Sequence, residues 1–144
     1  MIKKILKKLG AILLTIIVIL ILVVFVGRII TKEKYKVEGE NSICESTYVD
    51  INGLEQYILI KGKDINNPVI LWLHGGPGSP DSYENYKFVS YLVDDYTVVM
   101  YDQRGCGATY FKNIDIDPNN ETTSFRQAIE DVDALVDYLR ERFN

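Results

Sequence analysis

The sequence has few of the residues that usually bind metals or form disulfide bridges. Its 144 residues include one histidine, His74, and two cysteines, Cys44 and Cys106. Two cysteines are too few for a disulfide framework, and a single histidine gives no cluster with the spacing of metal ligands. We therefore expect two unpaired thiols, no metal and no cofactor.

Positive charge is scarce beyond the first 36 residues. Residues 1–36 hold eight basic residues and one acid, a net charge of +7, whereas the remainder of this −4 chain carries −11. The acidic remainder argues against nucleic acid as a partner. The basic first segment suits the anionic surface of a membrane.

The first segment contains a long uncharged run, residues 9–27, made mostly of Ile, Leu and Val. As a helix this run is about 28 Å long, close to the ~30 Å core of a bilayer. A buried core helix is the alternative, but a helix that is apolar on every face needs a larger protein around it. The sequence therefore predicts that residues 9–27 contact the lipid bilayer.

The residues that follow this run decide between a cleaved signal peptide and a retained anchor. Val26–Thr31 offers no small-x-small cleavage site, so residues 1–30 are predicted to be a retained signal anchor. Four lysines precede the run and four basic residues follow it, which makes the two flanks nearly equal. We expect a single-pass membrane protein whose globular part lies outside the cytoplasm.

The rest of the chain divides into a polar stalk, residues 31–46, and a globular domain, residues 47–144. In the domain, Asn52-Gly53 joins two predicted strands, 47–51 and 54–61, as a hairpin. Residues 69–73 and 96–101 are apolar at nearly every position, which is typical of parallel strands buried on both faces. A helix is predicted between them, at about residues 82–93, with Asp81 or Ser82 as its cap.

The last segment has the pattern of an amphipathic helix with a capping box formed by Ser124 and Gln127. Its predicted apolar face consists of Phe125, Ile129, Val132, Val136, Leu139 and Phe143. The order of elements is therefore hairpin, strand, helix, strand, helix, which indicates the α/β class.

Two glycine-rich motifs follow the two buried strands directly. The first is His74-Gly75-Gly76-Pro77-Gly78. A turn with almost no side chains lets backbone N–H groups point into the cleft at the carboxyl ends of parallel strands, where open α/β folds bind ligands. Such an N–H can stabilise the oxyanion of an acyl-transfer intermediate, and an ordinary loop is the alternative interpretation.

The second motif, Asp102-Gln103-Arg104-Gly105-Cys106-Gly107, makes the resemblance specific. The pair HGGPG and DQRGCG, at this spacing, resembles the proline iminopeptidases, the S33 peptidase group of α/β-hydrolases. The resemblance covers residues 47–144. It implies the N-terminal part of an α/β-hydrolase fold, with a β-hairpin and then β-α-β-α, preceded here by one transmembrane helix.

The resemblance also implies roles for the motif residues. Gly76 would give one backbone N–H to the oxyanion hole, Gly75, Pro77 and Gly78 would shape the loop, and His74 would support it rather than act as the triad base. The second motif would be a structural turn of Asp102, Gln103, Arg104, Gly105 and Gly107, in which Asp102 and Arg104 pair. Thr109 stands where the family often has serine, which keeps a hydroxyl group.

The nucleophile is not found in these 144 residues. No Gly-x-Ser-x-Gly motif occurs, and in this family the catalytic Ser, Asp and His follow in that order further along the chain. We therefore expect no catalytic residue in this chain and an N-terminal fragment of a membrane-anchored serine hydrolase, inactive alone. The complete protein would cleave small peptides or esters, as an aminopeptidase or a related hydrolase.

Two alternatives remain at this stage. One is a non-catalytic, membrane-tethered domain that binds a partner. The other is an α/β-hydrolase of the epoxide hydrolase or dehalogenase type, because these share a His-Gly-x-Pro loop. In the resembled fold, residues 69–73 lie between the strand 96–101 and a later strand, so we also expect an open strand edge that favours aggregation.

Overall fold

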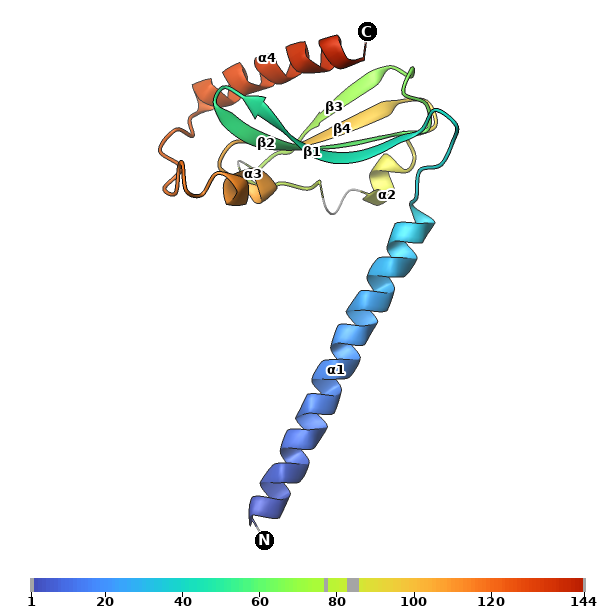
Figure 1. The fold of residues 1–144 in the computed structure, drawn as a ribbon, viewed down its shortest axis with the longest axis vertical. Helices are drawn as coiled ribbons and strands as arrows, with labels where there is room; N and C mark the ends of the chain where they lie inside the picture. Colours follow the sequence, from blue (N-terminus) through green and yellow to red (C-terminus); the bar gives the residue numbers. More distant parts are fainter. Residues whose placement is uncertain (1, 77, 83–85, 144) are drawn as a thin grey trace. The chain divides into compact units, whose positions relative to one another are not determined.

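A computed structural model describes residues 2–76, 78–82 and 86–143, and the chain divides into two units, Met1–Lys36 and Val37–Asn144. The first unit contains helix α1, Ile2–Lys34. The elements of the second unit are β1 (Ile43–Ile51), β2 (Leu54–Gly62), β3 (Val69–Leu73), α2 (Tyr86–Val89), β4 (Thr97–Asp102), α3 (Gly107–Lys112) and α4 (Phe125–Arg142) (Figure 1).

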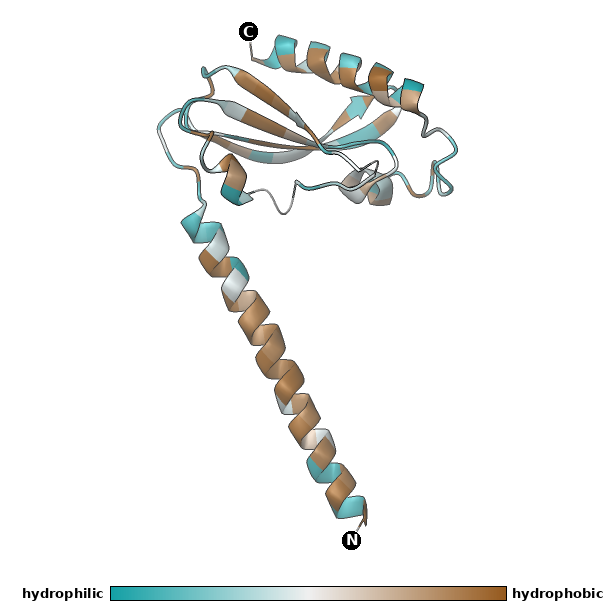
Figure 2. Cartoon of the chain, turned by 180° about the vertical axis from the view of Figure 1, so that it is seen from behind, coloured by the Kyte–Doolittle hydropathy of each residue, from teal (hydrophilic) through white to brown (hydrophobic). Residues whose placement is uncertain are grey.

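Helix α1 includes the whole uncharged run of residues 9–27. Figure 2 shows that its middle turns are hydrophobic around the helix, and none of its residues is buried. By length and composition alone, this helix is able to cross a membrane.

The sheet begins with the hairpin that the Asn-Gly pair predicts. Asn52 and Gly53 both have positive φ, 48° and 80°, as a tight turn between right-twisted strands requires. The flanking strands pair antiparallel from Ile43 opposite Gly62 to Ile51 opposite Leu54. The hairpin is therefore confirmed, with longer strands than the sequence indicated.

The described strands form one mixed sheet in the order β1-β2-β4-β3. β2 pairs antiparallel with β4, and β3 pairs parallel with β4, with Val69 opposite Thr97. All six residues of β4 are buried, as expected for a strand with neighbours on both sides. β3 is only partly buried, because it is an edge strand among the described residues.

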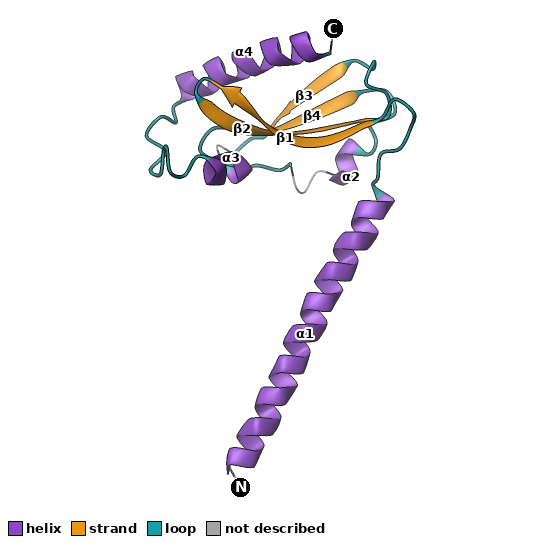
Figure 3. Ribbon diagram, in the orientation of Figure 1, coloured by secondary structure: helices purple, strands orange, loops and turns teal. Residues whose placement is uncertain are grey.

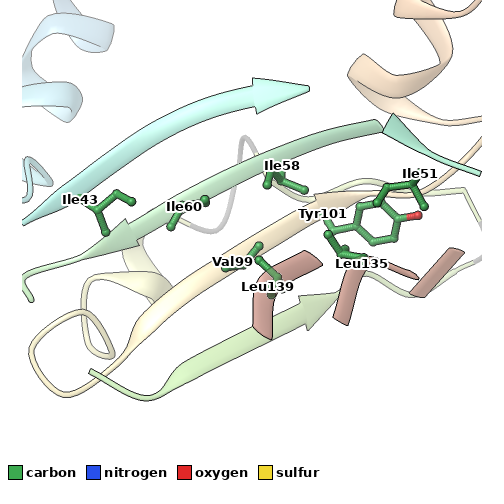
Figure 4. Packing of buried hydrophobic residues seen from close by; sticks show 8 residues of the cluster. All are labelled: Ile43, Ile51, Ile58, Ile60, Val99, Tyr101, Leu135 and Leu139. Atoms are coloured by element: carbon green, nitrogen blue, oxygen red, sulfur yellow. The ribbon is translucent and has the colours of Figure 1, made fainter. Parts of the chain in front are cut away.

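Helices cover both faces of the sheet: α4 lies on one face, and α2 and α3 lie on the other (Figures 1 and 3). Beneath α4, Leu135 and Leu139 pack on strand side chains, as Figure 4 shows; the buried cluster is Ile43, Ile51, Ile58, Ile60, Val99, Tyr101, Leu135 and Leu139. The opposite face buries Val37, Val89, Val93, Val98 and Met100. Alternate residues of β4 therefore supply both cores.

The predicted stalk, residues 31–46, is divided between other elements. α1 continues to Lys34, Val37 is buried in the second unit, and β1 begins at Ile43. In the sequence, Val37 and Ile43 are isolated among polar residues. Their burial depends on strands and turns that follow later in the chain, which local composition does not reveal.

The helix predicted at residues 82–93 is short where the structure describes it. α2 comprises Tyr86–Val89 and is followed by hydrogen-bonded turns, while residues 83–85 lie outside the described part. Asp81 accepts a hydrogen bond from the indole Nε1 of Trp72, at 3.1 Å, and Ser82 donates to Asp102, at 2.7 Å. The backbone N–H groups that the predicted cap would bind belong to residues outside the described part. Val89 and Val93 are buried, as the apolar pattern indicated.

Helix α4 is confirmed, and from Val132 onward its predicted apolar face packs on the core, through Val132, Leu139 and Phe143, whereas its first turns do not. Ser124 Oγ accepts a hydrogen bond from the N–H of Gln127, at 3.1 Å, which is one half of the capping box. The buried residues are Asp131, Leu135 and Leu139, whereas Phe125 is 85 % exposed and Ile129 58 % exposed. The first turns of α4 border an open cavity instead of the sheet, so their apolar side chains stay uncovered.

Candidate functional site

The two glycine-rich motifs meet at the carboxyl ends of the parallel strands β3 and β4. The N–H of Gln103 donates to Nε2 of His74 at 3.2 Å, and the side-chain amide of Gln103 donates to the carbonyl of His74 at 3.2 Å. The backbone N–H and the side-chain amide of Gln103 therefore both join the two loops. The structure brings together the residues that the sequence indicated separately.

The His74–Gly78 loop places backbone rather than side chains at the surface. His74 is buried at 6 % exposure, and its Nδ1 lies 3.3 Å from the carbonyl oxygen of Gly75. Gly75, Gly76 and Gly78 are exposed, and Gly76 has φ +61°, a conformation that side chains disfavour. Pro77 lies outside the described residues.

Asp102 fixes the start of the second turn. Its Oδ1 accepts from Ser82 Oγ at 2.7 Å and its Oδ2 from the N–H of Ala108 at 2.9 Å, while its carbonyl accepts from Thr109 Oγ1 at 2.5 Å. Gly107, with φ +53°, passes so close that a β-carbon there would lie 2.2 Å from Asp102 Oδ2. Asp102 and the glycine together tie β4 to α3.

The expected pairing of Asp102 with Arg104 is wrong. Arg104 pairs with Asp131 of α4, through Nε to Oδ2 at 2.7 Å and Nη2 to Oδ1 at 3.0 Å. Asp102, the last residue of β4, lies on the same side of the sheet as Met100, which faces α2 and α3. Strand alternation ends there, and the turn that follows β4 brings Arg104 to the α4 side, where Asp131 lies.

Asp131 is the residue that sequence analysis missed. Its side chain is fully buried, and hydrogen bonds come to it from Asn52, Gln56, Arg104 and Gln127. Burial alone would raise the pKa of this carboxyl group, but these donors, with Arg104 the largest, lower it below the ordinary value. The available signal was its spacing of four and eight residues from Leu135 and Leu139, which puts the acid on the buried face of α4.

Cys106 lies beside His74 but is not activated. Its Sγ donates to the carbonyl of Gln103 at 2.9 Å and lies 3.4 Å from His74 Nε2. Burial, together with the nearby charge of Asp102, raises the pKa of the Cys106 thiol to about 12. The neutral thiol packs the turn and is a poor nucleophile.

The loops and the start of α4 line an open cavity of about 780 Å³. Its residues are Leu73, His74, Gly75, Gly76, Gly78, Gln103, Arg104, Gly105, Thr123, Ser124, Phe125, Ala128, Ile129 and Val132. One wall is therefore backbone-rich and the other, from α4, is mainly apolar. Such a cavity at the carboxyl end of parallel strands suits a small organic substrate.

Comparison with known proteins agrees with this geometry. Residues 68–144 match the family model described as the alpha/beta hydrolase fold. The chain is 31 % identical over 105 residues to the probable aminopeptidase YbaC of Bacillus subtilis, which covers 73 % of this chain and 32 % of that protein. It is also 31 % identical over 87 residues to a proline iminopeptidase of Lactobacillus helveticus, covering 60 % and 28 %.

A solved structure gives the same result. The proline iminopeptidase-related protein TTHA1809 from Thermus thermophilus superposes with a TM-score of 0.56 at 27 % identity, over 67 % of this chain and 32 % of that one. The chain thus spans about a third of the length of the relatives that it matches.

Proposed function

We propose a function on the premise that this chain belongs to the α/β-hydrolase fold family and is similar to proline iminopeptidases. The proposal is that residues 37–144 supply the oxyanion side of a serine hydrolase that acts on small peptides or related esters and amides. The nucleophile, the acid and the base would be provided by residues other than these 144, because no Gly-x-Ser-x-Gly motif occurs among them.

The observation that carries the proposal is the exposed backbone of Gly76 in the cavity. Within the described residues, the N–H of Gly76 has no hydrogen-bond partner, although the loop beside it is held by Gln103. A fixed N–H without a partner is the group that stabilises a developing oxyanion, an effect of about 3–4 kcal/mol on the barrier. The hydrogen bond that Nε2 of His74 accepts from Gln103 supports the proposal that His74 holds this loop and is not the triad base.

The matches to an aminopeptidase and to proline iminopeptidases favour peptide over epoxide chemistry for this loop. The apolar wall formed by Phe125, Ile129 and Val132 is suited to an apolar or cyclic side chain. We therefore include N-terminal residues of short peptides, proline among them, in the proposed substrate class.

Membrane attachment through residues 9–27 is the second part of the proposal. It is supported by the 33-residue length of α1, the absence of buried residues in it and its basic ends. The globular unit would then lie on the outer side of the membrane. Extraction of cell membranes with alkaline carbonate and digestion of intact cells with protease test attachment and side, respectively.

A serine-reactive fluorophosphonate probe tests the catalytic part. The 144-residue chain alone should not react with the probe, and it should release no product from proline p-nitroanilide. The protein isolated from its native membranes should do both, through a serine outside these residues. Labelling of a serine within residues 1–144 would refute this assignment.

A binding role without catalysis remains the second candidate, because the edge of β3 has no partner among the described residues. A strand edge is a ready template for another chain. This candidate predicts that native membranes contain the 144-residue chain in a stable complex and show no probe-reactive form.

A further inference from the structure

We infer that Asp131 is a positioning residue, which holds the α4 wall of the cavity and the His74–Gly78 loop at a fixed separation. The inference rests on the proposed function, because it treats that loop as the donor of the oxyanion hole. It concerns a carboxylate that does not line the cavity but is bonded to elements on both sides of it.

The carboxylate of Asp131 accepts hydrogen bonds from distant parts of the chain. Asn52 Nδ2 donates at 2.9 Å and Gln56 Nε2 at 2.8 Å, both from the hairpin. Arg104 donates from the turn after β4, at 2.7 and 3.0 Å, and Gln127 donates from α4 itself, at 2.9 Å. One carboxylate thus joins the hairpin, the turn and the helix.

The turn transmits this anchoring to the loop. Arg104 is fixed in its plane by the two bonds to Asp131, and its Nη2 also donates to the carbonyl of Asn52 at 3.2 Å. The preceding residue, Gln103, makes the two 3.2 Å hydrogen bonds to His74. Movement of Arg104 therefore moves the residue that holds His74, and with it the start of the glycine loop.

The other side of the anchor is the cavity wall on α4. Val132 follows Asp131 directly, and Ile129 and Ala128 lie two and three residues before it; all three line the cavity. A helix is rigid over one turn, so the bond to Arg104 sets the distance of these side chains from the loop.

Stability alone does not explain why the buried pair of Asp131 and Arg104 is charged. A buried ion pair often contributes no more than well-packed apolar side chains of the same volume, because both ions lose their hydration. The pair does fix the orientation of the two side chains relative to each other, because the planar guanidinium and the carboxylate have one bidentate arrangement. A geometric role accounts for a fully buried acid on a helix face that otherwise buries leucine.

The single histidine makes the inference measurable without enzyme activity. The sample is the full chain, labelled with ¹⁵N-histidine and kept in mild detergent at alkaline pH, so that all signals come from His74. Because Nε2 of His74 accepts a hydrogen bond from Gln103, the ring proton sits on Nδ1. We expect one Nδ1–H tautomer in the ¹H–¹⁵N spectrum. Asp131→Asn should convert this signal to a mixture of both tautomers while the circular dichroism of the chain is retained.

Two further variants give the controls. Arg104→Lys keeps the positive charge but loses the planar guanidinium and its two parallel hydrogen bonds to Asp131, so it should also give a mixture of His74 tautomers. If Asp131→Asn does not fold, the result for Arg104→Lys tests the inference. Leu135→Ala, one turn further along the same buried face, should lower stability and leave the single tautomer unchanged. The inference is overturned if folded Asp131→Asn or Arg104→Lys keeps the wild-type signal, or if Leu135→Ala alters it equally. Loss of the proposed hydrolase function would not change these spectra, so the two failures are distinguishable.

Discussion

Asp131 and Arg104 form the most deeply buried ion pair described in this chain, with side-chain exposures of 0 % and 6 %. Removing one partner leaves the other charge buried and uncompensated, which costs about 3–5 kcal/mol. We therefore expect Asp131→Ala to lower the free energy of unfolding by about that amount in urea titrations. Arg140→Ala, which breaks an exposed pair with Asp137, should change it by less than about 0.5 kcal/mol.

The pair also makes stability depend on pH. The pKa of Asp131 is lower in the folded than in the unfolded chain, so the unfolded state takes up its proton first as the pH falls. The contribution of Asp131 is complete above its ordinary pKa of about 3.9 and is lost below it, as the pH passes the folded-state value. The stability difference between wild type and Asp131→Asn should therefore shrink in acid, and a constant difference would contradict this account.

Three glycines of the site give a graded prediction. Gly75→Ala has open space and should cost less than about 0.5 kcal/mol. Gly76→Ala is also uncrowded but has φ +61°, so it should cost about 1–2 kcal/mol. Gly107→Ala combines a positive φ with a clash against Asp102 and should cost about 2–5 kcal/mol. Chemical denaturation of the three variants checks the order, and equal effects would show that the backbone at Gly76 relaxes.

The two cysteines should differ in reactivity. Cys44 is exposed, whereas Cys106 is buried and its pKa is raised to about 12. Iodoacetamide at mildly alkaline pH should alkylate one thiol in the native chain and two in urea, counted by mass spectrometry. Cys44→Ser should leave no reactive thiol in the native state. Rapid modification of Cys106 would show that the turn opens readily.

At the scale of the elements, α4 illustrates both the strength and the limit of sequence patterns. The helix and its Ser124 cap are predictable because periodicity and capping are local properties of the chain. The predicted face is correct where Val132, Leu139 and Phe143 pack on the core, but it fails at the start of the helix. There Phe125 and Ile129 are apolar but border the cavity, while the charged Asp131 is buried. Burial of an acid depends on Arg104, Asn52 and Gln56, whose approach no local pattern encodes.

Substitutions along α4 test this arrangement. Leu135→Ala should cost about 2–5 kcal/mol, because it opens space in the core beneath the helix. Ile129→Ala should change the free energy of unfolding by less than about 0.5 kcal/mol, since its side chain is 58 % exposed. Ser124→Ala should cost about 1 kcal/mol through loss of the cap. A large effect at Ile129 would mean that another segment covers this end of the helix.

The strands show the same division. The hairpin and the buried β4 follow from turn chemistry and apolar runs, and the meeting of the two motifs follows from the parallel pairing of β3 and β4. The partner of Arg104 could not be predicted, because it depends on which face of the sheet each residue after β4 selects. The short α3 was missed as well, since Gly107–Lys112 has no apolar periodicity of its own.

At the scale of the whole molecule, the β3 edge should govern association. Residues 37–144, expressed without α1, should form oligomers, because Leu73 is 46 % exposed beside unpaired strand N–H and C=O groups. Leu73→Lys should reduce association, and Tyr91→Lys, with the same charge at an exposed site outside β3, should not. Size-exclusion chromatography with light scattering is the measurement. A wild-type monomer with a sharp cooperative melt would contradict the prediction.

The position of β3 in the sheet also has a consequence during translation. A strand that pairs with it in parallel needs a crossover of about a dozen residues or more, so within one polypeptide it would leave the ribosome after α4. At about 5–20 residues per second, the edge then waits on the order of a second or longer for that neighbour. During this interval, nascent chains on one polysome carry identical open edges. Chaperone occupancy at this stage of synthesis, rather than the stability of the finished fold, would then limit the yield of the protein.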